Sequence, residues 1–275
     1  MFDIAWADDS FTISGYTFRL QHRTTTTTAD DAFVFYKDRS QVEQFDRFFM
    51  ETGFRPTRVL ELGIWDGGSA AFWTEVLQLK RYAAIDVQTR GDSAYFTAWV
   101  RDRGTGRVTT HWGVGQTDEP ALESILADGL DPLDLVLDDC SHQYGPTLRS
   151  FEVLFGRLRP GGWYIIEDWA WALQPEFQAR DHPWGIHPPL HPVVHQLIDL
   201  HGSRPDLIPS VRVYPAFVAI ERGVAPVDDG LEIAALIARR QRPWPLIGRR
   251  WARRRVGQLG RAFRPTAAAG RLSTV

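Results

Sequence analysis

The feature that most constrains the fold is an alternation of short apolar segments with helical segments between Arg58 and Trp169. The five apolar segments are residues 58–64, 81–87, 107–114, 133–139 and 161–169. Between them, helices are expected over residues 69–79, 93–102, 119–128 and 147–158. Strands that alternate with helices are joined by right-handed crossovers, which place helices on both faces of a parallel sheet. The sequence therefore predicts a doubly wound α/β domain.

The chain before this region is expected to form a strand pair and a helix. Residues 10–20 alternate between apolar and polar side chains around Ser14-Gly15, as two antiparallel strands joined by a tight turn do. Residues 40–54 carry apolar side chains at helical spacing. Ser40 is placed to cap the start of that helix in a capping-box pattern.

After Trp169 the pattern is less regular. Residues 191–200 favour a helix, and residues 211–214 and 216–222 favour an antiparallel pair that closes one edge of the sheet. The expected organisation is an N-terminal extension, an α/β domain and a basic C-terminal tail, over residues 1–57, 58–223 and 224–275.

The basic tail creates a strong charge asymmetry. From Ile233 to the end the chain has 11 arginines and no acidic residue, whereas the net charge of the whole chain is −3. The remainder therefore carries −14, which argues against an enzyme whose catalytic face binds nucleic acid. The tail itself has two interpretations: it contacts an anionic membrane surface or an acidic partner, or it is a terminus without fixed structure.

Cysteine content and hydropathy indicate the compartment. Cys140 is the single cysteine, so no internal disulfide can form, and this suits a reducing environment. The first residues, MFDIAWADDSFTISG, lack the basic and apolar regions of a signal peptide. No stretch approaches the roughly 18 apolar residues of a membrane span. The sequence predicts a cytoplasmic protein without stable membrane insertion.

The first two strand ends carry a pattern that suits a nucleotide-like ligand. The first strand runs into the glycine-rich segment 61–69, ELGIWDGGS, and the second ends in Asp86. Glycines allow a tight turn and a close approach of the backbone to a ligand at the start of the next helix. An acid at the end of the second strand can accept hydrogen bonds from ribose hydroxyls. The alternative is a tight turn without a ligand, and Asp86 favours the ligand site.

The fourth and fifth strand ends carry up to four carboxylates. Asp138 and Asp139 end the fourth strand, and Glu167 and Asp168 end the fifth. Like charges buried together are costly unless a cation or a shared proton relieves their repulsion. Either pair alone would be explained by a helix cap or a solvated turn. Two such pairs at neighbouring strand ends favour a site for Mg²⁺ or another divalent metal, which prefers oxygen ligands.

His142 follows Asp139 by three residues. If the chain turns there, the imidazole can reach a substrate hydroxyl at the same metal and take its proton. The alternative is a histidine that donates a hydrogen bond to a turn.

Residues 138–169, DDCSHQYGPTLRSFEVLFGRLRPGGWYIIEDW, strongly resemble the metal-dependent sugar O-methyltransferases of macrolide biosynthesis, such as the macrocin and mycinamicin methyltransferases. They are also similar to the cephalosporin hydroxylase and rhamnosyl O-methyltransferase group. Those families carry D-D-G-S-H, a helix, and then L-x-x-G-G-x-Y-x-I-E-D. The turn at 61–69 is similar to the E-x-G-x-x-x-G turn of class I methyltransferases. Cys140 stands where the family has glycine.

The resemblance implies a Rossmann-like methyltransferase sheet, S-adenosylmethionine as cofactor and Mg²⁺ or another divalent ion as the metal. It implies that His142 is the catalytic base and that the metal ligands are Asp139, Glu167 and Asp168. The expected contacts of S-adenosylmethionine are Glu61, Gly63, Trp65, Gly67, Ser69, Asp86, Gln116 and Asp138.

The expected activity is transfer of a methyl group from S-adenosylmethionine to a hydroxyl of a small molecule, and the resemblance favours a sugar hydroxyl of a secondary metabolite, as in antibiotic biosynthesis. Three alternatives remain open at this point. The acceptor is a phenol or catechol, the enzyme is a metal-assisted hydroxylase or hydrolase, or the chain is a non-catalytic S-adenosylmethionine-binding accessory protein of a biosynthetic complex. The resemblance also implies a homo-oligomer.

Residues 182–195 contain four histidines, and prolines interrupt any helix through His187 and His191. We expect this segment to be a loop that leads into a helix and forms part of a lid over the substrate. Trp169, Trp171 and Trp184 would pack that lid or stack on a substrate ring.

Overall fold

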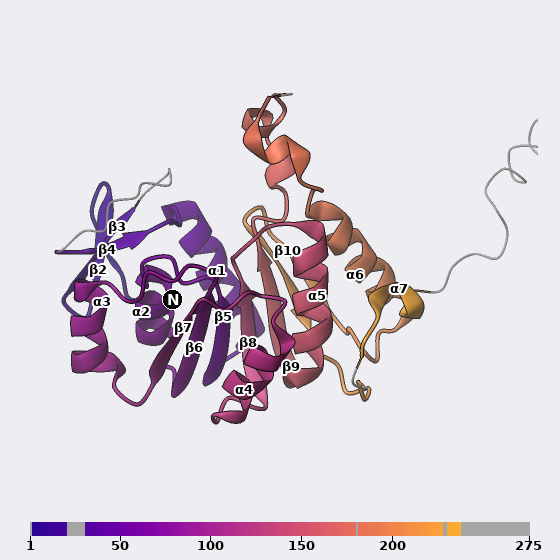
Figure 1. Ribbon diagram of the computed structural model, residues 1–275, viewed down its shortest axis with the longest axis horizontal. Coiled ribbons are helices and arrows are strands. Elements are labelled where there is room, and N and C mark those ends of the chain that lie inside the picture. The colour runs from indigo at the N-terminus through magenta and orange to yellow at the C-terminus, as the bar shows by residue number, and fades with distance from the viewer. Residues whose placement is uncertain (1, 21–30, 180, 228–229, 238–275) are drawn as a thin grey trace, which may run out of the picture. The chain divides into compact units, whose positions relative to one another are not determined.

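The computed structural model describes residues 2–20, 31–179, 181–227 and 230–237. A seven-stranded sheet of order β10-β11-β9-β8-β5-β6-β7 lies at its centre (Figure 1). Its strands are β5 (Arg58–Leu62), β6 (Arg81–Asp86), β7 (Val108–Trp112), β8 (Leu133–Asp138), β9 (Leu158–Glu167), β10 (Val211–Val213) and β11 (Phe217–Glu221). Strands β5 to β9 are parallel, and β11 and β10 complete the sheet as an antiparallel edge pair. The predicted doubly wound sheet is confirmed.

The strand order places a ligand site at one edge of the sheet. From β5 the chain goes first to β6 and β7 on one side, and then returns to β8 and β9 on the other side. At such a switch point the loops after adjacent strands separate, which leaves a crevice outside the carboxyl ends of the strands. The glycine turn follows β5, and the two acidic pairs end β8 and β9. The fold therefore brings all of the predicted site segments to one edge.

Helices cover both faces of this sheet. They are α1 (Arg39–Thr52), α2 (Gly68–Leu77), α3 (Ala94–Trp99), α4 (Glu119–Ala127), α5 (Tyr144–Leu154), α6 (His191–Ser203) and α7 (Ile233–Leu236), and α3 continues into a π-helical turn over Val100–Gly104. One apolar core lies under α1, α2 and α3, and a second lies under α4, α5, α6 and α7. The central strand β8 is buried along its whole length and contributes side chains to both cores, as expected for a parallel strand covered on both faces.

The N-terminal extension forms a small sheet of its own. Its strands are β1 (Ala5–Trp6), β2 (Ser10–Ile13), β3 (Tyr16–Leu20) and β4 (Phe33–Phe35). The predicted pair around Ser14-Gly15 is confirmed as β2 and β3, and β4 pairs with β3 in parallel. The rings of Phe11 and Phe18 stack on each other and contact the edge of Phe72 in α2. The extension therefore shares the first core with the large sheet rather than standing apart from it.

A glycine permits the close contact between this small sheet and α2. A Cβ atom at Gly68 would lie 2.3 Å from the carbonyl oxygen of Val34, which is too close for any side chain at this position. Strand β4 therefore docks directly on the start of α2, and the chain leaves it toward the carboxyl edge of the large sheet. Tyr36 and Lys37 follow immediately and line the cavity described below.

The start of α1 differs from the prediction. The helix begins at Arg39, and Asp38 is its N-cap: the Asp38 side chain accepts from the backbone N–H of Gln41, and the Gln41 side chain accepts from the backbone N–H of Asp38. The prediction that Ser40 caps the helix is wrong. An aspartate and a glutamine satisfy the free N–H groups at a helix start as well as a serine and a glutamate do. Asp38 and Gln41 have the same spacing as the predicted pair and lie two residues earlier, and they form the cap.

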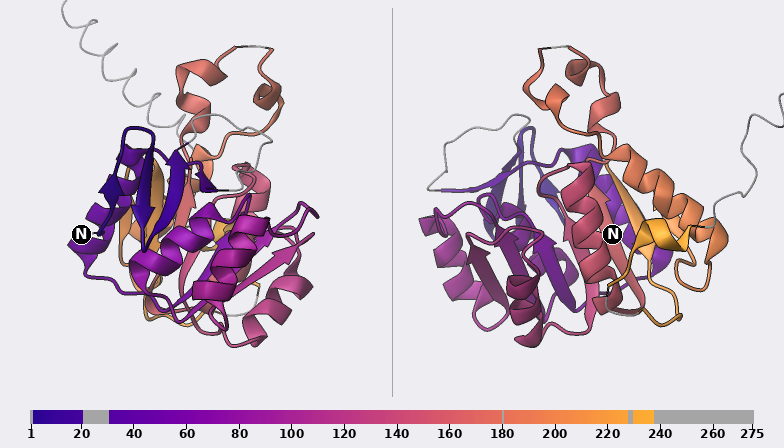
Figure 2. Two further views of the ribbon diagram at one scale, coloured as in Figure 1. Left: turned by 90° about the vertical axis from the view of Figure 1, so that its left-hand side faces the viewer. Right: turned by 45° about the vertical axis from the view of Figure 1, so that its right-hand side comes forward.

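Between β9 and α6, residues 168–179 and 181–190 form an arm that projects from the carboxyl edge of the sheet (Figures 1 and 2). Its described part contains short 3₁₀ turns and is held by contacts among aromatic rings, chiefly those of Trp171, Phe177 and Trp184. The predicted loop that leads into a helix is confirmed, with α6 beginning at His191. Whether the arm covers a substrate stays a prediction.

The predicted basic tail is described only at its beginning. Leu231 and Ile233 are buried in the second core, and residues 238–275, with all 11 of the tail's arginines, lie outside the described residues. The predicted domain boundaries stay predictions. Among the residues that the structure describes, none of the helices combines the length and the apolar character needed to cross a bilayer.

Candidate functional site

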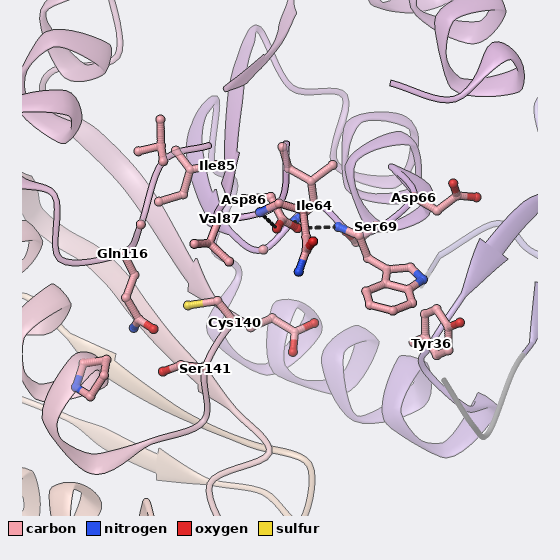
Figure 3. Close-up of a pocket in the computed structure, with 18 of the residues that line it drawn as sticks. Tyr36, Ile64, Asp66, Ser69, Ile85, Asp86, Val87, Gln116, Cys140 and Ser141 are labelled. Atoms are coloured by element: carbon pink, nitrogen blue, oxygen red, sulfur yellow. Dashed lines mark hydrogen bonds between the residues drawn. The ribbon is translucent and has the colours of Figure 1, made fainter. Parts of the chain in front are cut away.

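A cavity of about 510 Å³ opens beyond the carboxyl ends of β5 and β6 (Figure 3). The glycine turn after β5, the end of β6 and the loop after β7 form three of its walls. The segment after β8 and the residues after β4 complete it. The lining residues used below are Tyr36, Lys37, Gly63, Trp65, Ser69, Asp86, Gln116, Asp139 and Cys140.

Asp86 fixes the shape of the glycine turn. One oxygen of its carboxylate, Oδ2, accepts from the backbone N–H groups of Ile64 at 3.1 Å and Trp65 at 3.0 Å. Figure 3 shows Asp86 beside Ile64 at this turn. The other oxygen, Oδ1, accepts from the N–H of Gln88 at 2.8 Å. These bonds hold the turn open at the cavity. They leave Asp86 about one further acceptor position for a ligand, because a carboxylate accepts about four hydrogen bonds.

Gly63 is required where the turn crosses the end of β8. Its φ is +111°, and a Cβ atom there would lie 2.2 Å from the carbonyl oxygen of Asp139. The backbone N–H of Asp139 donates to the carbonyl of Leu62 at 2.9 Å, so the two strand ends are tied together at this point. The cavity wall and the acidic strand end are therefore parts of one rigid junction.

Aromatic side chains cover the outer part of the cavity. Trp65 has a φ of +51°, which is unusual for a bulky residue. Its ring and the Tyr36 ring are arranged edge to face, with their centroids 5.1 Å apart. The guanidinium of Arg90 lies over the same indole at 5.1 Å and over Trp112 at 5.6 Å. Backbone conformations of this kind persist when the surroundings enforce them, commonly at ligand sites.

The predicted cofactor residues divide into two groups. Gly63, Trp65, Ser69, Asp86 and Gln116 line the cavity, whereas the other three are placed behind its wall: Glu61, Gly67 and Asp138. The buried carboxylate of Glu61 accepts from the hydroxyls of Ser69 and Tyr82. That of Asp138 accepts from Tyr164 and Ser150, each at 2.8 Å, and from the Cys140 thiol. Gly67 lies against the Phe96 ring and is the N-cap of α2. These three residues support the site rather than line it.

The ends of β8 and β9 form a cluster beside the cavity. Ligand atoms of Asp139, His142 and Asp168 lie within 4.8 Å of one another. Nε2 of His142 is 3.7 Å from Oδ1 of Asp139 and 3.9 Å from Oδ2 of Asp168. His142 and Asp168 both have left-handed backbones, with φ of +51° and +50°. Such residues cost of order 1–3 kcal/mol and concentrate at functional sites.

Glu167 belongs to this cluster but contacts a residue that the sequence reasoning missed. The Lys37 ammonium donates to Oδ2 of Asp139 at 2.6 Å and to Oε2 of Glu167 at 2.7 Å. Both Lys37 and Glu167 are buried. The sequence contains a weak signal, because Lys37 directly follows the apolar run FVFY. Nothing local indicates that it reaches strand ends more than a hundred residues away.

Burial and charge shift the pKa values of these acids in opposite directions. Burial raises the pKa of Glu167 well above its usual value, and the neighbouring Asp139 charge adds to the rise, against Lys37. The pKa of Asp168 is also raised by burial, against the opposing effect of His142. For Asp139, burial acts in the same direction, but the charges of Lys37 and His142 prevail and lower the pKa. The cluster is thus a set of like charges under strain from desolvation, which a cation relieves.

The raised pKa of Glu61 makes the stability of the fold depend on pH. Burial raises its pKa to about 7 from 4.5, against the effects of Lys37 and Tyr82. The folded chain therefore holds a proton that the unfolded chain releases between these values, so native stability falls as pH rises through this window. We expect the free energy of unfolding of Glu61→Gln, relative to the native chain, to rise by about 2 kcal/mol between pH 5 and pH 8.

The measurement is urea unfolding of both chains in EDTA at several pH values. Glu75→Gln is the control, because the pKa of Glu75 is lowered rather than raised: against the effect of burial, hydrogen bonds from Arg103 and Ser14 and the charge of Arg103 lower it. A difference between native chain and Glu61→Gln that does not change with pH would contradict the shift.

Comparison with known proteins finds similarity to methyltransferases over part of the chain. Residues 60–169 match the sequence profile of a methyltransferase domain. The chain is 32% identical over 146 residues to the demethylmacrocin O-methyltransferase of Streptomyces fradiae, with 50% of this chain and 34% of that protein covered. It is 29% identical over 142 residues to the 8-demethyl-8-alpha-L-rhamnosyl tetracenomycin-C 2'-O-methyltransferase of Streptomyces olivaceus, with 49% and 34% covered.

Among solved structures, the chain is similar to the MycE methyltransferase of the mycinamycin biosynthetic pathway, solved with Mg, SAH and mycinamycin VI. The two share 28% identity and a TM-score of 0.51 over 69% of this chain and 51% of that one. The chain thus spans about a third of the length of the curated relatives it matches. Residues 60–169 of this chain therefore match a methyltransferase domain, and the similar proteins over this region are named as O-methyltransferases, one of them for a rhamnosyl compound.

Proposed function

We propose that this chain transfers a methyl group from S-adenosylmethionine to a hydroxyl of a small molecule, at a site that also holds a divalent metal. One observation carries the proposal. Asp139 lines the cavity at the glycine turn and also belongs to the acidic cluster with His142 and Asp168. A ligand in the cavity and a substrate at the cluster would therefore meet at one residue, as a transfer reaction requires.

The cavity suits S-adenosylmethionine in size and in chemistry. Its volume of about 510 Å³ lies in the range of cofactor sites. Asp86 offers carboxylate oxygens for ribose hydroxyls, and Tyr36 and Trp65 supply aromatic surface. When bound, S-adenosylmethionine supplies an electrophilic methyl group. The similar MycE structure was solved with SAH, which supports the assignment.

The cluster suits a hard divalent cation. Asp139 and Asp168 provide carboxylate oxygens, and Oε1 of Glu167 is buried with no hydrogen-bond partner among the described residues. We propose that these three carboxylates hold Mg²⁺, which when bound would supply positive charge to acidify a hydroxyl. The similar MycE structure also contains Mg.

His142 is placed to take the proton of the acceptor hydroxyl. The left-handed backbone directs its imidazole into the acidic cluster, and two residues of the arm hold it there. The indole N–H of Trp171 donates to the His142 carbonyl at 2.8 Å, and the Trp184 ring stacks on the imidazole with centroids 6.1 Å apart. A base fixed on both sides keeps the orientation that proton transfer needs.

For the acceptor, we propose a sugar hydroxyl of a secondary metabolite. The names of the similar proteins support a sugar, because one refers to a rhamnosyl group. The arm beside His142 exposes apolar side chains, Leu173 at 59% and Ile186 at 83%, which suits an acceptor with an apolar portion. A phenol or catechol is the other acceptor class to be tested. A cytoplasmic location and assembly into a homo-oligomer stay predictions.

The test is a calorimetric titration of S-adenosylhomocysteine into the full chain, followed by assays on glycosylated acceptors. We expect a 1:1 complex in Mg²⁺ and also in EDTA, because Asp86 and the glycine turn do not depend on the metal. Release of S-adenosylhomocysteine with a sugar acceptor would establish the activity. Asp86→Asn should weaken binding, and Asp92→Asn, whose carboxylate accepts from Thr110 and Trp112 at the surface, is the matched control. Absence of binding in both buffers would reject the proposal.

A further inference from the structure

Lys37 differs from the other basic residues of the chain. The sequence has 29 arginines and two lysines, Lys37 and Lys80. Lys80 is exposed, whereas Lys37 is buried with its ammonium between two carboxylates. An ammonium is a compact charge, and the planar guanidinium of arginine occupies more space with a fixed geometry. The space between Asp139 and Glu167 therefore suits the compact charge of a lysine better than the larger group of an arginine.

The ammonium contacts one oxygen of each carboxylate and leaves the other. It holds Oδ2 of Asp139 at 2.6 Å and Oε2 of Glu167 at 2.7 Å. The other oxygen of Asp139, Oδ1, lies on the side of His142, 3.7 Å from Nε2. The other oxygen of Glu167, Oε1, is buried and has no hydrogen-bond partner in the part of the chain that the structure describes. Each carboxylate is therefore fixed through one oxygen and keeps one for a second cation.

The charges of the cluster balance when two cations are counted. Asp139, Glu167 and Asp168 carry three negative charges when ionised, and Lys37 supplies one positive charge. A divalent ion would supply the remaining two. Buried charge without compensation is costly, so this balance favours a divalent ion at the three carboxylates.

We propose that Lys37 is a positioning residue that sets the affinity of this cluster for a divalent cation; the inference rests on the metal site of the proposed function. Its ammonium fixes the orientation of Asp139 and Glu167 before a cation binds, and the same charge repels that cation. Loss of an outer partner of a metal ligand weakens binding by about 10–100-fold. Repulsion between a single and a double positive charge a few ångströms apart changes the affinity by more. The repulsion therefore dominates, and Lys37 keeps metal binding weaker than the carboxylates alone would make it.

The test compares Mn²⁺ binding by the full native chain and by Lys37→Met, which removes the charge and keeps most of the side-chain length. We expect calorimetry to show at least tenfold tighter Mn²⁺ binding by Lys37→Met. Lys80→Met, the only other lysine substitution the chain offers, should bind Mn²⁺ as the native chain does. Equal or weaker binding by Lys37→Met would overturn the proposal, because a residue with a packing role alone does not repel the metal.

Thermal unfolding in EDTA and in Mn²⁺ covers the case in which Lys37→Met folds poorly. Without Lys37 the buried carboxylates lack their cation, so Mn²⁺ should raise the Tm of Lys37→Met by more than it raises the native Tm. Folding of the variant only in Mn²⁺ would support the proposal in the same way. Failure to fold in Mn²⁺, with no gain in Tm at any concentration, would overturn it.

The outcomes separate this inference from the proposed function. If the native chain binds S-adenosylhomocysteine and Lys37→Met shows no gain in Mn²⁺ affinity, the role of Lys37 is rejected and the methyltransferase proposal stands. If the native chain binds no S-adenosylhomocysteine but Lys37→Met binds Mn²⁺ more tightly, the role of Lys37 is supported and the methyltransferase proposal is rejected.

Discussion

His142→Ala is expected to lower kcat by about 10²–10⁴-fold while the chain still binds S-adenosylhomocysteine and Mg²⁺. The imidazole lies 3.7 Å from Asp139 and 3.9 Å from Asp168, but it does not line the cavity at the glycine turn. Its removal should therefore spare cofactor binding. The three carboxylates remain, so the metal site should persist. The loss would appear in the step that needs proton removal from the acceptor.

The measurement combines steady-state kinetics with calorimetry on the same preparation. His195→Ala is the matched control, because His195 is an exposed histidine of α6 outside the cluster. Undiminished turnover in His142→Ala would remove His142 from the mechanism. A loss of Mg²⁺ binding in the same proportion as turnover would instead identify His142 as a metal ligand, a possibility that its distance to both carboxylates raises.

Asp139→Asn is expected to abolish activity and to weaken Mg²⁺ binding by more than about 100-fold, beyond the 10–100-fold typical of outer-shell partners. Asp139 has the lowered pKa of the cluster because the effect of Lys37 and His142 exceeds that of burial, so it is the carboxylate that stays ionised as pH falls. Asparagine keeps the shape but removes the charge. Lys37 would then retain Glu167 as its remaining close carboxylate.

The measurement is activity against Mg²⁺ concentration, with a parallel titration of S-adenosylhomocysteine. Cofactor binding should change little, because the backbone of Asp139, and not its carboxylate, meets the glycine turn at Gly63. Asp199→Asn, at an exposed position of α6, is the control. Full activity of the native chain in EDTA would show that the reaction needs no metal and would reject this part of the proposal.

The partners of Glu61 could not be predicted from the sequence pattern. The pattern E-x-G-x-x-x-G places Glu61 at a strand end, and the resemblance makes it a cofactor contact. In the structure Glu61 is not among the residues that line the cavity, and its carboxylate accepts hydrogen bonds from Ser69 and Tyr82. Tyr82 is a β6 residue on the same face of the sheet, so the direction of Glu61 is decided by a partner on the neighbouring strand. A motif gives the position of a residue along a strand but not the partner that its side chain finds.

The sheet, its carboxyl edge and most of the residues at that edge follow from the sequence pattern. Alternating strands and helices allow few topologies, and parallel strands bring their carboxyl ends to one edge, so Asp86, Asp139 and Asp168 had to lie along that edge. The way in which the edge is completed depends instead on tertiary packing. Lys37 lies 102 residues from Asp139 and 130 from Glu167, and it reaches them because the N-terminal sheet docks on α2. Contacts over such separations follow from packing and charge compensation between whole elements, which no local periodicity encodes.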